Sequence, residues 1–119
     1  MLKKKKILVV EDDRFLSDIY KRQLAEKGHQ VEVAVNGKEA LEKLEMMVPD
    51  VILLDLIMPG MDGFDFLAEL RKQPAHEKRR VIVLTNLGQD GDKERCHTLG
   101  VKEYFVKTEM SIEDVVNAV

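Results

Sequence analysis

The chain has 119 residues, of which 45% are hydrophobic and 34% are charged, and its formal net charge is −3. This length and composition predict a single globular domain over residues 1–119 and exclude a disordered chain. The acidic balance argues against nucleic-acid binding, and no apolar stretch is long enough to span a membrane. Because Cys96 is the sole cysteine, an internal disulfide is excluded and a reducing compartment such as the cytoplasm is expected.

The first half of the chain alternates between strand-like and helix-like patterns. In chain order, the patterns predict a strand at Ile7–Val10, a helix from Leu16 to Leu24, a strand at residues 31–35, a helix after Asn36 and a strand at Val51–Leu54. Gly28 supplies a stop for the first helix. Asn36 and Glu39 have the spacing of a capping box at the start of the second helix, and Pro49 breaks that helix.

The second half of the chain continues the same alternation. In chain order, the patterns predict a helix around Phe66–Leu70, a strand at Val81–Leu84, a helix over residues 92–99, a strand at Val101–Val106 and a final helix after Ser111. The first of these helices ends before Pro74, and the second stops at Gly100. Ser111 and Asp114 can cap the final helix.

Five strands that alternate with five helices predict an α/β fold with a parallel sheet. Strands one, three and four are continuous apolar runs, as expected where helices cover both faces of a central strand. The second strand alternates and the fifth carries Lys102, Glu103 and Tyr104, so these two are the better edge strands. The predicted architecture is a flavodoxin-like (βα)5 three-layer sandwich with strand order 2-1-3-4-5. Ligands of such sheets bind beyond the carboxyl ends of the strands, at the switch point between strands one and three.

Carboxylates follow two of the central strands. Glu11, Asp12 and Asp13 come directly after the first strand, and Asp55 comes directly after the third. Clustered carboxylates disfavour one another's ionisation unless a cation compensates them. An oxygen-rich site of this kind suits Mg²⁺, whereas no histidine or cysteine stands at the spacing that zinc requires. Asp13 is the exception, since its place before a helix is that of a helix cap.

Two further polar residues follow strands at the same edge of the sheet, Thr85 after the fourth strand and Lys107 after the fifth. Asp55 is therefore a candidate nucleophile toward phosphorus, and its attack would give an acyl phosphate. Lys107 would neutralise charge on the phosphoryl oxygens, and Thr85 would donate a hydrogen bond to the product phosphate.

These strand ends and their neighbours resemble the receiver domain of two-component response regulators. The resemblance covers nearly the whole chain, from Lys6 to the last helix, and rests on Val10-Glu11-Asp12-Asp13, Leu54-Asp55-Leu56-Ile57-Met58-Pro59-Gly60-Met61-Asp62-Gly63, Leu84-Thr85-Asn86 and Tyr104-Phe105-Val106-Lys107. It implies a signalling switch, not an enzyme, that accepts a phosphoryl group from a histidine kinase or a phosphotransfer protein. The surface that changes would be residues 92–119, which would contact a downstream protein, an output domain or a second copy of the domain.

The resemblance also implies a role for each matching residue. The implied roles are phosphoacceptor for Asp55, Mg²⁺ ligands for Glu11, Asp12, Asp55 and the backbone carbonyl of Ile57, phosphate contact for Lys107, and a switch pair of Thr85 and Tyr104. In this pair, the hydroxyl moves toward the phosphate and the aromatic ring turns inward behind it.

Thr108 is the clear departure from the family pattern, which usually has a cis proline after this lysine. Since a cis bond before a non-proline residue costs about 3–4 kcal/mol, we expect either a trans bond at Lys107–Thr108 or a strained site. Glu11 stands where aspartate is more usual, and its longer arm favours a water-mediated metal contact. Ile57 and Leu87 are apolar neighbours that cannot position a water by hydrogen bonding, so we expect slow hydrolysis of the phosphoaspartate.

Two other functions fit parts of this pattern. A Mg²⁺-dependent phosphatase with an aspartyl nucleophile would carry a second acid two residues after that nucleophile, where this chain has Ile57. A flavodoxin-like nucleotide carrier would need a hydroxyl- or glycine-rich loop after the first strand to hold phosphate. This chain has three acids there, which repel a phosphate unless a metal intervenes. Both alternatives are therefore disfavoured.

Overall fold

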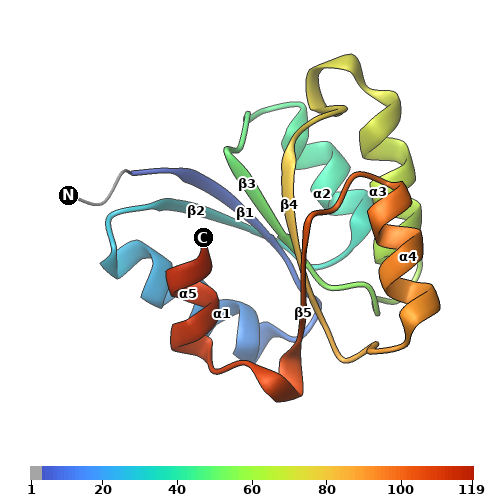
Figure 1. Cartoon of the computed structure of the whole chain (residues 1–119). Coiled ribbons are helices and arrows are strands. Elements are labelled where there is room, and N and C mark those ends of the chain that lie inside the picture. The colour runs from blue at the N-terminus through green and yellow to red at the C-terminus, as the bar shows by residue number, and fades with distance from the viewer. Residues whose placement is uncertain (1–3) are drawn as a thin grey trace.

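Strands and helices alternate along residues 4–119, which are the residues that the structure, a computed structural model, describes (Figure 1). The strands are β1 Lys6–Val10, β2 Gln30–Ala34, β3 Val51–Leu54, β4 Arg80–Thr85 and β5 Glu103–Val106. The α-helices are α1 Arg14–Glu26, α2 Gly37–Leu44, α3 Gly63–Lys72, α4 Asp90–Thr98 and α5 Ile112–Ala118. Two short 3-10 turns, η1 Pro74–His76 and η2 Lys107–Glu109, follow α3 and β5. The first three residues of the predicted domain lie outside the described part.

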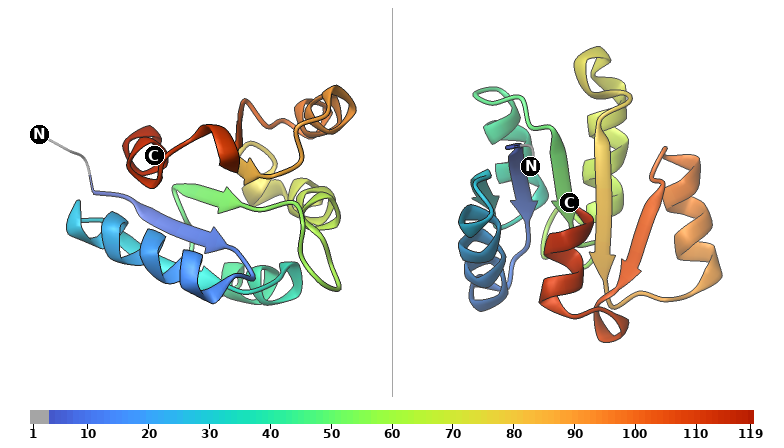
Figure 2. Two further views of the ribbon diagram at one scale, coloured as in Figure 1. Left: turned by 90° about the horizontal axis from the view of Figure 1, so that it is seen from below. Right: turned by 60° about the vertical axis from the view of Figure 1, so that its left-hand side comes forward.

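The described strands form one five-stranded parallel sheet in the order β2-β1-β3-β4-β5, which confirms the predicted α/β fold and strand order. The strand arrowheads in Figure 2 point toward the same end of the molecule. The carboxyl ends of the strands therefore share one edge. At this edge β1 and β3 are direct neighbours, so the predicted switch point lies between them.

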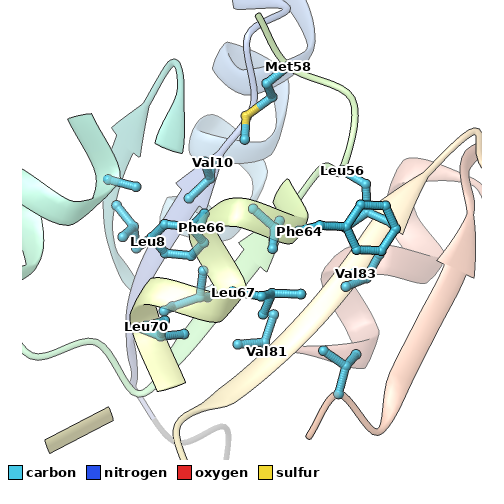
Figure 3. Packing of buried hydrophobic residues seen from close by; sticks show 14 of the residues in the cluster. Leu8, Val10, Leu56, Met58, Phe64, Phe66, Leu67, Leu70, Val81 and Val83 are labelled. Atoms are coloured by element: carbon cyan, nitrogen blue, oxygen red, sulfur yellow. The ribbon is translucent and has the colours of Figure 1, made fainter. Parts of the chain in front are cut away.

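Helices cover both faces of the sheet, as the apolar central strands require. On one face, α1 and α5 pack through side chains such as Tyr20 and Val115. On the other face, α2, α3 and α4 pack against the sheet, and Phe66 and Leu67 of α3 lie at the centre of that core (Figure 3). Within the central strands β1, β3 and β4, polar side chains occur only at the strand ends. Within residues 4–119, no helix is both long and apolar enough to cross a membrane.

Side-chain caps fix where several helices begin. The side chain of Asn36 accepts a hydrogen bond from the backbone N–H of Glu39 at 2.8 Å, at the start of α2. Ser111 and Asp114 exchange both hydrogen bonds of a capping box at the start of α5. Asp13 caps α1 with its carboxylate, which confirms its predicted role as a helix cap.

The boundaries of α4 and β5 differ from the predicted ones. β5 begins at Glu103 and not at Val101, because the chain turns at Gly100, whose φ is +80°. The backbone N–H of Val101 then donates to the carbonyl of Cys96 at 3.0 Å and closes the end of α4 instead of joining the sheet. α4 begins at Asp90, earlier than predicted.

Gly63 lets α3 begin in close contact with the segment that follows β3. A Cβ atom at this position would lie 2.6 Å from the carbonyl oxygen of Asp55 and 2.6 Å from the Cα of Leu56. The backbone N–H of Gly63 donates to the carbonyl of Leu56 at 3.0 Å. Any larger residue would therefore have to displace the backbone that carries Asp55.

Candidate functional site

The predicted acids meet at the carboxyl ends of β1 and β3. Val10 pairs with Leu54 across these strands, so Glu11 and Asp55, the next residues, are neighbours. The backbone N–H of Asp55 donates to the carbonyl of Val10 at 3.0 Å, which extends the ladder one step beyond the strands. Only 3% of Glu11 and 6% of Asp55 are exposed, so both carboxylates need compensation by positive charge.

Glu11, Asp12 and Asp55 form a cluster of possible metal ligands. Each offers one carboxylate oxygen, and these atoms all lie within 4.8 Å of one another. Asp12 is exposed while the other two residues are buried, so the cluster opens to solvent at Asp12. Three carboxylates make the hard, oxygen-only donor set that Mg²⁺ takes. The residues present therefore fit a divalent cation.

Lys107 reaches both buried acids from the end of β5. Its Nζ lies 2.6 Å from Oε1 of Glu11 and 2.9 Å from Oδ2 of Asp55. Burial alone would lower the pKa of Lys107, but the hydrogen bonds to Glu11 and Asp55 outweigh it and raise the pKa. No cis peptide bond occurs within residues 4–119, so the Lys107–Thr108 bond is trans, the first of the two predicted alternatives. Lys107 points toward the acids even though no proline follows it.

Each buried carboxylate also accepts a hydrogen bond from the backbone. The N–H of Ile57 donates to Oδ1 of Asp55 at 3.2 Å, and the N–H of Asp13 donates to Oε2 of Glu11 at 3.3 Å. Burial raises the pKa of Glu11 to about 7; the hydrogen bond from Lys107 opposes this rise and the charge of Asp55 adds to it. The shared ammonium of Lys107 and a separate backbone N–H thus orient each of the two carboxylates.

Thr85 and Tyr104, the predicted switch pair, are joined through Leu87 in the loop after β4. Thr85 is fully buried at the end of β4, and its Oγ1 accepts a hydrogen bond from the backbone N–H of Leu87 at 3.4 Å. The Tyr104 hydroxyl donates to the carbonyl of the same residue. Thr85 pairs with Val106 in the sheet, so Lys107 follows its strand partner directly. The loop residue Leu87 therefore connects two side chains that lie on neighbouring strands.

Tyr20 lies close to the buried acids, a position that the sequence pattern does not reveal. A cavity of about 10 Å³ lies beneath the acids and is lined by Tyr20, Glu11 and Asp55 together with apolar residues. Burial raises the pKa of the Tyr20 phenol to about 12, with the charge of Lys107 opposing the rise and that of Glu11 adding to it. The helical spacing of Tyr20 on α1 indicates that it faces the core, but not that carboxylates stand opposite.

Comparison with known proteins agrees with this geometry. Residues 7–119 match the family model of the response regulator receiver domain. The phosphate regulon transcriptional regulatory protein PhoB of Rhizobium meliloti is 34% identical over 102 residues, which cover 86% of this chain and 45% of PhoB. This chain therefore spans less than half the length of that curated relative.

Two solved structures show the same likeness in three dimensions. The chemotaxis protein CheY4 of Vibrio cholerae superposes with a TM-score of 0.90 at 28% identity, over 98% of this chain and 96% of that one. The phosphorylated cyanobacterial phytochrome response regulator RcpA superposes with a TM-score of 0.84 at 29% identity, over 98% of this chain and 89% of that one.

The family match includes every residue of the acidic cluster, and the cluster is consistent with a phosphorylation site. The strand order of the structure agrees with the family fold across the whole sheet. The chain therefore belongs to the response regulator receiver domains of two-component signalling, which are phosphoacceptor signalling modules and not catalytic enzymes.

Proposed function

We propose that this domain is a phosphorylation-controlled switch that accepts a phosphoryl group on Asp55 from a histidine kinase or a phosphotransfer protein. The observation that carries this proposal is the setting of the Asp55 carboxylate. Its Oδ2 lies 2.9 Å from Nζ of Lys107, and it belongs with Glu11 and Asp12 to one cluster of oxygen ligands. The relative RcpA, which is named as phosphorylated, supports the same chemistry for this fold.

The proposed step transfers one phosphoryl group between side chains. An oxygen of Asp55 attacks the phosphorus of a phosphohistidine, so that a P–O bond forms as the P–N bond breaks. The imidazole nitrogen keeps the electron pair of the broken bond and takes up a proton. Lys107 already contacts Asp55 and holds its positive charge beside the phosphoryl oxygens. The hydroxyl of Thr85 donates a hydrogen bond to the phosphate of the product.

Mg²⁺ is the proposed cofactor, with the carboxylates of Glu11, Asp12 and Asp55 as its protein ligands. The resemblance to the family adds the backbone carbonyl of Ile57 to this proposed set. When bound, it neutralises negative charge on the phosphoryl oxygens. Glu11 also contacts Lys107: its Oε1 accepts a hydrogen bond from Nζ of Lys107 at 2.6 Å. Glu11 therefore positions the ammonium that faces Asp55.

Phosphorylation is proposed to shift an equilibrium between two arrangements of residues 92–119. In the described arrangement, Leu87 accepts from the Tyr104 hydroxyl and donates to Thr85. If the Thr85 hydroxyl turns toward the phosphate, it gives up its hydrogen bond from Leu87. The loop after β4, which Tyr104 also contacts through Leu87, is then held less firmly. The surface of α4, β5 and α5 then changes for a downstream protein, an output domain or a second copy. A kinase partner and the free thiol of Cys96 together favour a cytoplasmic location.

A long-lived phosphoaspartate is the proposed kinetic character of this switch. Ile57 is 52% exposed beside Asp55, and neither it nor Leu87 carries a side-chain group that could orient an attacking water. Decay of the phosphorylated protein is followed by intact mass after removal of the donor. A half-life of only seconds would contradict slow hydrolysis but would leave the phosphoacceptor role intact.

Intact mass spectrometry after incubation with acetyl phosphate and Mg²⁺ tests the central proposal. The wild type is expected to gain one phosphoryl group, and the gain is expected to disappear in Asp55→Asn and after chelation of the metal. Asp65→Asn is the matched control, because Asp65 is an exposed carboxylate on α3. An unmodified wild type, or a gain that survives in Asp55→Asn, would overturn the proposal.

A further inference from the structure

A basic cleft lies at the end of the sheet opposite the acidic cluster. It has a volume of about 270 Å³, is open to solvent, and lies between the segment that enters β4 and the turn that enters β5. Figure 1 shows both of these segments at the end where the strands begin. Its charged lining residues are Lys78, Arg79, Arg80, Lys102 and Glu103. Four positive groups thus share the cleft with one negative group, in a chain whose formal net charge is −3.

The single acid in the cleft already has a partner. Arg80 holds Glu103 with two hydrogen bonds of 2.7 and 3.0 Å and also donates to the carbonyl of Ala118. Within residues 4–119, neither Lys78 nor Lys102 forms an ion pair, and the Arg79 side chain donates only to neutral acceptors. The positive charge of the cleft is therefore in excess and available to an anion.

Arg71 holds the two walls of the cleft in place. Its guanidinium donates to the carbonyl of Leu99 at 2.8 Å and to that of Arg79 at 2.9 Å, although Arg71 itself does not line the cleft. Gly100 completes one wall with a φ of +80°, a backbone conformation that glycine adopts without strain. The Arg71 guanidinium bonds only carbonyl groups, so it fixes the geometry and adds a further uncompensated positive charge.

We propose that this cleft binds a small, multiply charged anion that carries phosphate groups. Ammonium and guanidinium donors from two fixed walls match the several oxygens of such a group. The volume of about 270 Å³ suits a small molecule, and the overall negative charge of the chain disfavours an extended nucleic acid. The cleft lies at the opposite end of the sheet from Asp55, so its ligand does not depend on the phosphoacceptor role.

Titration with inorganic pyrophosphate, in chelator and without Mg²⁺, tests this site. Amide chemical shifts are expected to move saturably at residues 78–81 and 100–103, while those around Asp55 stay in place. The double variant Lys78→Ala/Lys102→Ala is expected to weaken binding at least about tenfold, because two charges that face the anion are removed. Both lysines are exposed, so the variant is expected to remain folded, as circular dichroism would verify.

The matched control is Lys38→Ala/Lys72→Ala, which removes the same charge from exposed positions on α2 and α3. This control is expected to bind pyrophosphate as the wild type does. If both double variants bound pyrophosphate equally weakly, the net charge of the protein and not the cleft would explain the loss, which would overturn the proposal. Shifts centred on residues 11, 12 and 55, or no saturable shift at all, would overturn it as well. None of these outcomes bears on phosphorylation of Asp55.

Discussion

Lys107 supplies the positive charge that two buried carboxylates share. Its ammonium contacts Glu11 at 2.6 Å and Asp55 at 2.9 Å, and only 17% of its side chain is exposed. Removing one partner of a buried ion pair leaves an uncompensated charge, which destabilises a protein far more than the loss of an exposed pair does. The lysine therefore stabilises the fold as well as facing Asp55, the proposed phosphoacceptor.

Substitution of Lys107 by methionine is expected to lower the free energy of unfolding by about 3 kcal/mol in the absence of metal. Mg²⁺ is expected to stabilise this variant more than the wild type, because a bound cation replaces the missing ammonium and binds only the folded state. Thermal denaturation with and without MgCl₂ measures both effects.

Lys72→Met is the matched control for this prediction. Lys72 pairs with Glu69 at 2.9 Å, but 71% of its side chain is exposed, so its loss is expected to change stability by about 0.5 kcal/mol or less. If Lys107→Met were as stable as Lys72→Met, Lys107 would not be compensating the buried acids. If Mg²⁺ stabilised the wild type, Lys107→Met and Lys72→Met equally, the metal would not be replacing the Lys107 ammonium beside these carboxylates.

The residues of the acidic site were predictable because each follows a recognisable strand. A parallel sheet brings the carboxyl ends of its strands to one edge, so Glu11, Asp55 and Lys107 could be placed together without coordinates. Tyr20 was not predictable as part of the site, since helical spacing shows which residues face inward and not what they meet. The contact between Glu11 and Lys107 depends on side-chain reach, which strand order alone does not determine.

At the scale of the secondary-structure elements, α3 and α4 are attached to the sheet in different ways. α3 buries Phe64, Phe66, Leu67 and Leu70, whereas α4 buries only Cys96. Polar contacts supplement that small core, among them Arg95 over the ring of Phe64 at 4.0 Å. α4 has no apolar stripe, whereas the apolar residues of α3 recur at helical spacing. Both helices begin earlier than the predicted ranges, α3 at Gly63 and α4 at Asp90.

The start of α3 gives a prediction for a single added methyl group. Gly63→Ala is expected to lower the free energy of unfolding by about 2–3 kcal/mol, because its Cβ would lie 2.6 Å from backbone atoms of Asp55 and Leu56. The same displacement is expected to weaken Mg²⁺ binding, since it moves the backbone that carries Asp55, a proposed ligand. Urea denaturation and calorimetric titration measure the two effects.

Gly91→Ala provides the matched comparison for this substitution. Gly91 lies in α4 with no heavy atom near the position of an added Cβ, so alanine is expected to raise stability by about 0.5–1 kcal/mol. Similar stability changes in the two variants would show that the contact at Gly63 is not what excludes a side chain there.

At the scale of the whole molecule, one sheet separates two hydrophobic cores. Tyr20 lies in the core beneath α1 and α5, and Tyr104 packs against the core beneath α2, α3 and α4. The chain has two tyrosines and no tryptophan, so each core contains its own fluorescent reporter. Since both cores use the same central strands, neither can form without the sheet, and we expect them to unfold together.

Single-tyrosine variants test this cooperativity. In Tyr104→Phe only Tyr20 fluoresces, and in Tyr20→Phe only Tyr104 does. Within each variant, the urea midpoint from fluorescence is expected to coincide with that from far-ultraviolet circular dichroism. A fluorescence transition that precedes the dichroism transition in one variant alone would show that its core opens separately.

The strand order of the whole molecule was predictable from polarity, because fully apolar strands belong at the centre and mixed strands at the edges. The basic cleft was not, since its walls come from turns whose approach depends on Arg71 and on the φ of Gly100. Sequence patterns describe elements well, but they contain little information on how two loops face each other.

The sequence distance across the acidic site has a consequence for the newly synthesised chain. Lys107 lies 96 positions from Glu11 and 52 from Asp55. Because β3 and β4 lie between β1 and β5 in the sheet, these groups meet only after β1, β3, β4 and β5 have paired. Parallel pairings of this kind are non-local, and they form slowly. Until they form, Asp55 is an ordinary hydrated carboxylate with no ammonium beside it. Under the proposed phosphoacceptor role of Asp55, an incompletely folded copy is therefore expected to remain unphosphorylated, because its aspartate lacks the ammonium and the carboxylates that surround it in the folded domain.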